Sequence, residues 1–87
     1  MSKTVLEMAT DTLDALAESG RAYESLKAAE GMLERARAAA GWAQTPRAVR
    51  DALAAHVAGL QAAWEQKSAA AASLGDQLRA AREASGR

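Results

Sequence analysis

One stretch near the middle of the chain, Gly41 to Arg47, constrains the fold more than any other feature. It reads Gly-Trp-Ala-Gln-Thr-Pro-Arg and holds the single proline of the sequence. Gly41 suits the left-handed position after a helix, while Thr45 and Pro46 suit the N-cap and the first residue of a new helix. The stretch therefore predicts a turn at 41–45 between two helices of nearly equal length, at about 4–40 and about 46–84.

Both flanking segments carry helical periodicity. A capping box at Thr4 and Glu7 opens the first, and its apolar stripe slips near Gly20, which permits a kink there. The second segment has a cleaner heptad repeat. The residues predicted to form the seam between the helices are Leu13, Leu16, Tyr23, Leu26 and Leu33 in the first segment and Leu53, Val57, Leu60, Trp64, Leu74 and Leu78 in the second.

Folding the two segments back about the turn pairs positions whose numbers sum to about 87. Large residues then meet large residues, because Tyr23 faces Trp64 and Leu13 faces Leu74. This agreement predicts an all-α antiparallel helical hairpin, a two-helix coiled coil that forms one domain over residues 1–87.

The predicted core is thin, because alanine supplies most of the apolar residues and the chain has no Phe. Alanine gains little free energy on burial, so we expect the hairpin to gain stability from a partner or from a second copy. A face of small residues off the seam would let another helix approach and form a four-helix bundle; the alternative is that alanine is simply the best helix former. The residues that represent this predicted association face are Ala52, Ala55, Gly59 and Ala62.

Charge and composition exclude several classes of function. The formal net charge is zero, which argues against a protein that mainly binds nucleic acid non-specifically. The sequence has no Cys and no apolar run as long as a membrane span. Glu7 precedes any apolar signal-peptide region, so we expect a cytoplasmic protein, with secretion by another route left open. The preference for Arg over Lys and the abundance of Ala indicate a high-GC bacterium or its phage.

The turn end is the most distinctive surface in the sequence. Trp42 either packs back on the preceding helix or anchors a partner, since Trp is enriched in interface hot spots. Four arginines accompany it and could steer an acidic protein surface; binding of nucleic acid by a dimer is the alternative. The candidate partner-binding residues are Trp42, Arg35, Arg37, Arg47 and Arg50.

No arrangement in the sequence indicates catalysis. His56 is the only histidine, and it has neither the Cys or His partners of a zinc site nor a nucleophile to activate. An acidic stripe could bind a cation, but it is better explained as a solvated face that meets Arg79 and Arg82 across the hairpin. Its members are Glu7, Asp11, Asp14 and Glu18. We therefore expect no enzyme, no cofactor, no metal and no small-molecule substrate.

Two helical-hairpin families resemble this chain in architecture. The run Gly41-Trp42-Ala43-Gln44 resembles the mid-chain turn of the secreted WXG100 family, although Gln44 stands where that family has glycine. The hairpin form is also similar to the type III secretion needle co-chaperones, which implies a helical-repeat partner. Both likenesses concern the fold alone. The sequence thus predicts a non-catalytic interaction module, such as an adaptor, an inhibitor or a chaperone-like hairpin, that packs its helices on another protein.

Overall fold

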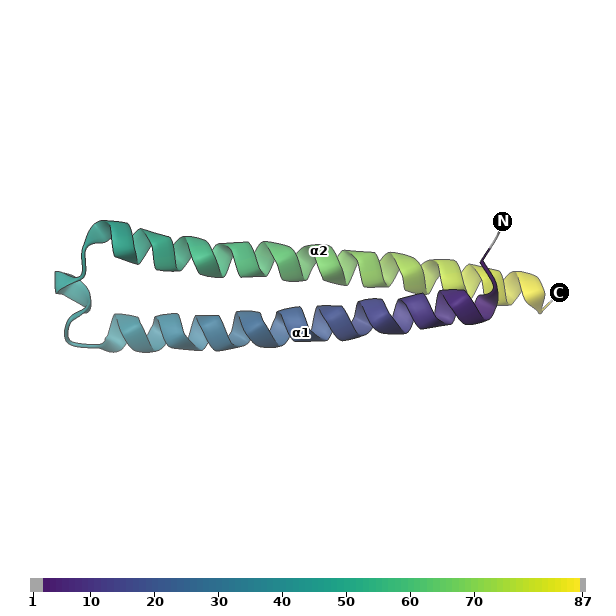
Figure 1. Cartoon of the computed structure of the whole chain (residues 1–87), viewed down its shortest axis with the longest axis horizontal. Helices are drawn as coiled ribbons and strands as arrows, with labels where there is room; N and C mark the ends of the chain where they lie inside the picture. The colour runs from purple at the N-terminus through teal and green to yellow at the C-terminus, as the bar shows by residue number, and fades with distance from the viewer. Residues whose placement is uncertain (1–2, 87) are drawn as a thin grey trace.

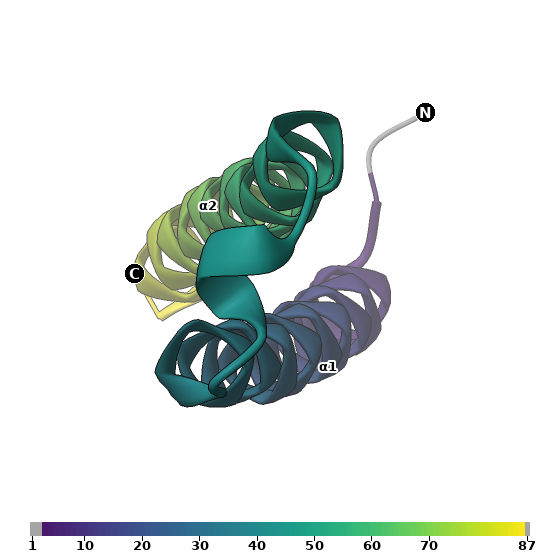
Figure 2. The same ribbon diagram turned by 90° about the vertical axis from the view of Figure 1, so that its left-hand side faces the viewer.

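Two long helices form the whole architecture of the computed structural model, which describes residues 3–86. Helix α1 spans Val5–Ala38, the short 3-10 helix η1 spans Trp42–Gln44, and α2 spans Arg47–Ser85. The two long helices run antiparallel along each other, and η1 closes one end of the rod (Figure 1). The end-on view shows two helices in contact and no further layer of described chain (Figure 2). The chain is the predicted helical hairpin; Met1, Ser2 and Arg87 of the predicted domain lie outside the described residues.

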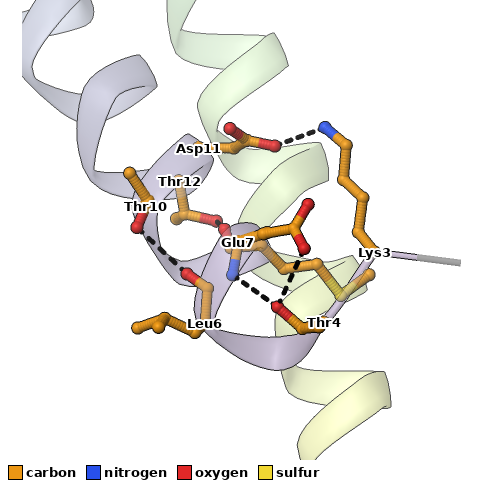
Figure 3. A network of polar contacts seen from close by, with 8 residues as sticks. Lys3, Thr4, Leu6, Glu7, Thr10, Asp11 and Thr12 are labelled. Atoms are coloured by element: carbon orange, nitrogen blue, oxygen red, sulfur yellow. Dashed lines mark hydrogen bonds and ion pairs between the residues drawn. The ribbon is translucent and has the colours of Figure 1, made fainter.

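The start of α1 has one half of the predicted capping box, because the Glu7 side chain reaches back to the Thr4 hydroxyl and not to the Thr4 backbone N–H. The backbone N–H of Glu7 donates to the Thr4 hydroxyl over 3.1 Å, and that hydroxyl donates to the Glu7 carboxylate over 3.2 Å (Figure 3). Lys3 forms an ion pair with Asp11, which lies one helical turn after Glu7. The hydrogen bond to Asp11, followed by the attraction of its charge, raises the pKa of Lys3. The bond from the Glu7 N–H satisfies one helix-end donor that would otherwise lack a partner.

The turn differs from the prediction in its backbone conformation. Gly41 has a φ of −84° rather than the predicted left-handed value, because α1 ends earlier. Ala39 leaves the helix in an extended conformation, with φ of −71° and ψ of 146°. Pro46 occupies the N-cap of α2, whereas the sequence predicted it at the first helical position. The Thr45 hydroxyl was predicted to cap α2, but it donates to the Gly41 carbonyl over 3.0 Å. An extended residue followed by a 3-10 turn reverses the chain without any left-handed residue.

This geometry predicts that Gly41→Ala leaves the free energy of unfolding unchanged or raises it by up to about 1 kcal/mol. Alanine tolerates the observed φ, and a Cβ at Gly41 would meet nothing within 4 Å. A left-handed Gly41 would instead make alanine destabilising by about 1 kcal/mol. Urea denaturation of the variant and the wild type distinguishes the two conformations, and a clear loss of stability would contradict the one described here.

Helix α1 runs without interruption through Gly20, so the permitted kink is absent (Figure 1). One row of its buried and half-buried positions runs in steps of four and three from Met8 to Ala36, with no slip. In order, they are Met8, Thr12, Ala15, Ser19, Ala22, Leu26, Ala29, Leu33 and Ala36. From Thr12 to Ala22 this seam consists of small or polar residues, where the sequence predicted Leu13, Leu16 and Tyr23.

The predicted register of the two helices agrees with the observed contacts. The ring of Tyr23 meets the ring of Trp64 edge-on, with centroids 5.6 Å apart. One turn away, the hydroxyls of Ser19 and Ser68 lie 2.9 Å apart and share a hydrogen bond. Both pairs have residue numbers that sum to 87, as the folding of the chain about its turn predicts.

The hairpin buries little of its apolar surface. Only Leu26 and Ala71 are buried apolar residues within the described chain, at 2% and 4% exposure. The radius of gyration is 19.3 Å, whereas a compact chain of this length has about 12 Å. The accessible surface is 6436 Å², whereas a compact monomer of this mass exposes roughly 4,900 Å². The rod therefore exposes about 1,500 Å² more than a compact fold of the same chain.

Candidate interaction surfaces

An apolar face on the outside of α1 is the clearest candidate surface. Leu13 and Leu16, predicted to lie in the seam, are 67% and 53% exposed, and Leu6 is 77% exposed. The Leu6 side chain points away from α2 (Figure 3). The predicted seam positions Leu13 and Leu16 were wrong by one residue, which rotates the face by about 100°. Tyr23, at the end of this face, keeps its predicted contact with Trp64 of α2. We call this face the outer stripe; its members are Leu6, Ala9, Leu13, Leu16, Gly20 and Tyr23.

A groove runs beside the outer stripe, between the two helices. Its volume is about 440 Å³, and Leu16 forms part of one wall. The α2 wall is made mostly of small residues, with Asp76 and Arg79 at one end. The small residues are Ser68, Ala71, Ala72 and Gly75. A helix that packs on the outer stripe therefore also has room to approach α2.

The predicted small-residue association face on α2 is exposed along its length. All four of its predicted members, Ala52, Ala55, Gly59 and Ala62, are exposed. A Cβ added at Gly59 would meet nothing within 4 Å. The hairpin itself does not use this face, but nothing in its geometry requires an occupant, since alanine is also favoured on solvated helices.

A second groove lies nearer the turn and is almost entirely apolar. It has a volume of about 310 Å³ and is lined by Ala29, Met32, Leu33, Ala36, Leu53, His56 and Val57. Met32 is 64% exposed and Leu53 is 40% exposed, so Leu53 lies at the edge of the seam rather than within it. His56 is exposed at the rim, which places it on the surface of the hairpin beside apolar neighbours.

The turn end carries the predicted Trp42 and arginine residues. Trp42 begins η1 and is half-buried, which fits neither a fully packed nor a fully exposed side chain. Arg35 lies in the last turn of α1, where a cation is favoured by the helix dipole. Arg47 lies in the first turn of α2, where the dipole opposes it, and pairs with Asp51 over 3.7 Å.

The remaining two arginines of this end differ in their surroundings. Arg37 is exposed in the last turn of α1. Arg50 is half-buried, and its Nε is buried without a hydrogen-bond partner among residues 3–86. The four arginines therefore share one end of the rod without forming a single charged pocket among the grooves described above.

The acidic stripe is a solvated face, but its partners differ from the predicted ones. Glu18 lies 4.0 Å from Lys67 on α2, and Arg79 pairs with Asp76 of its own helix over 3.6 Å. The predicted meeting with Arg79 and Arg82 is therefore wrong: Arg79 pairs with a residue of its own helix, and Arg82 forms no ion pair with the acidic stripe within residues 3–86. Across residues 3–86, no three His, Cys, Asp or Glu side chains are grouped closely enough to hold a metal ion.

Comparison of the chain with protein-family models, with curated proteins and with solved structures finds no match. None of the helices within residues 3–86 is both long and apolar enough to cross a membrane.

Proposed function

We propose that this chain is a non-catalytic interaction module that acts by packing its helices on a protein partner. One observation carries the proposal: leucines are exposed on the outside of α1, while Leu26 and Ala71 are the only apolar residues buried within residues 3–86. Exposed apolar patches of this kind mark protein interaction sites on soluble folds. A partner that covers them adds the burial that the two helices do not provide for each other.

The charges of the hairpin support a protein partner over nucleic acid. The formal net charge is zero. Four of the basic residues outside the turn end are already paired with acidic residues: Lys3, Lys27, Lys67 and Arg79. Binding to a phosphate backbone needs several free cations on one face. The arginines at the turn end could still steer the approach of an acidic protein.

Photocrosslinking in cells that produce the chain naturally tests the proposal. A benzophenone amino acid placed at Leu13, Ala62 or Gln44 samples the outer stripe, the small-residue face and the turn end. The same group at Glu83, an exposed polar position near the end of α2, is the control. We expect discrete protein adducts from one of the three probes and none from the control.

Absence of a discrete protein adduct at all three positions would rule the proposal out. Adducts of equal yield at Glu83 would do the same, because they indicate random collision. Adducts that disappear on nuclease treatment would favour the nucleic-acid alternative instead.

A further inference from the structure

We infer that the outer stripe of α1 binds the same stripe of a second copy of this chain, antiparallel and about a two-fold axis between Leu13 and Leu16. This inference rests on the proposed function and names the partner. Two copies of one surface can meet in this way only if the surface is complementary to itself. The order of side chains along α1 meets that condition.

The outer stripe reads the same from either end in side-chain size. Its order is large, small, large, large, small, large, at Leu6, Ala9, Leu13, Leu16, Gly20 and Tyr23. An antiparallel copy whose paired numbers sum to 29 places Leu13 against Leu16 of the second copy and Ala9 against Gly20. Large residues then fill the space between the helices at the axis, and small residues let the backbones approach on either side.

The small positions of the stripe are free to take part in such a contact. A Cβ at Gly20 would meet nothing within 4 Å in the hairpin, and Gly20 is exposed while Ala9 is half-exposed. A glycine in a helix interior costs about 1 kcal/mol relative to alanine. In the proposed dimer, the absence of a side chain at Gly20 lets the second copy approach closely, whereas packing within the hairpin does not require a glycine there.

The exposed area is large enough for a partner of this size. The rod exposes about 1,500 Å² more than a compact monomer of its mass, and a standard dimer interface covers about 800 Å² on each partner. One copy on the outer stripe therefore removes about half of the excess. The groove beside Leu16 lets the incoming helix contact α2 as well, which makes the dimer a four-helix arrangement.

Sedimentation equilibrium of the full chain tests the assignment. We expect a mass of about twice 9.1 kDa at micromolar concentration. The double variant Leu13→Glu with Leu16→Glu should dimerise at least about 100-fold more weakly, because the two-fold axis repeats each lost contact. Both side chains are exposed in the hairpin, so circular dichroism should show retained helix. Met32→Glu, a similarly exposed control outside the stripe, should leave the mass unchanged.

Disulfide formation tests the antiparallel register without disturbing the leucines. The chain has no Cys of its own, so Ala9→Cys and Gly20→Cys can be made in separate chains. Mixed chains should cross-link under mild oxidation, whereas either variant alone should not, because equivalent positions lie about 16 Å apart along the paired helices.

A monomeric wild-type mass over the same concentration range would overturn the second-copy assignment. So would a Leu13→Glu and Leu16→Glu variant that dimerises like the wild type, or Cys variants that cross-link only with themselves. If the chain is monomeric but the photocrosslinking probes yield adducts with a different protein, the proposed function stands and only the identity of the partner is wrong.

Discussion

Replacing Leu26 with alanine is expected to lower the free energy of unfolding by about 3 kcal/mol. Leu26 is 2% exposed and is the only large side chain that residues 3–86 bury so completely. Its removal costs the transfer free energy of the side chain and leaves a cavity between two straight helices that have few neighbours to fill it. Small domains have little stability to lose, so the variant should be largely unfolded at temperatures where the wild type is folded.

Urea denaturation followed by circular dichroism measures this loss. Met32→Ala is the matched control, since Met32 lies on the same helix and is 64% exposed; its effect should stay within about 0.5 kcal/mol. Equal losses from the two variants would show that Leu26 is not the centre of the packing between α1 and α2.

Replacing both Gly59 and Gly75 with alanine is expected to raise the free energy of unfolding by roughly 2 kcal/mol. Both glycines lie in the interior of α2, where alanine is favoured by about 1 kcal/mol at each position. A Cβ at either position would meet nothing within 4 Å, so the gain is not offset by a steric clash. A change of this size should raise the midpoint of thermal unfolding by about 8–16 °C.

The single variants Gly59→Ala and Gly75→Ala distinguish an effect of helix propensity from an effect of association with a partner. If each glycine acts only through helix propensity, the two gains should be equal and additive. A loss of stability from Gly59→Ala at high protein concentration alone would mean that the small-residue face of α2 contacts a partner at close range. Gly75→Ala tests the groove of the proposed dimer in the same way, because Gly75 lines it; a loss from this variant at high concentration alone would place the close contact in the groove instead.

The sequence predicted the class of fold and the register, because each depends on a strong local signal. The turn interrupts both repeats at one place, and only one face of α2 carries large residues such as Leu60 and Leu78. Because only that face of α2 can bury large residues, the sequence allows one register for the antiparallel pair of helices. The contact of Tyr23 with Trp64 follows directly from that reasoning.

The face of α1 that is buried could not be predicted in the same way. Two sets of positions, one led by Thr12 and the other by Leu13, differ by a single residue and are both compatible with a helix. Side-chain size favours the leucines, but α2 packs on the set that contains Thr12, Ser19 and Leu26. Which of two faces turns inward is decided by tertiary packing, and the face left outside, with Leu13 on it, became the candidate site.

The turn shows the same limit at smaller scale. Gly41 and Pro46 correctly mark where the chain reverses. They do not determine the conformation, because the extended backbone at Ala39 ends α1 without a left-handed residue. A glycine near a helix end is compatible with several turn geometries.

Thermal unfolding at a series of protein concentrations tests the central claim most directly. Helical content is followed by circular dichroism across a hundredfold range of concentration. If two copies of the chain share the outer stripe of α1 around Leu13, the midpoint rises with concentration, because dimerisation adds to the stability of the folded state. The Leu13→Glu and Leu16→Glu variant should lose that rise. A midpoint that stays constant for the wild type would contradict the account and show that the hairpin folds alone.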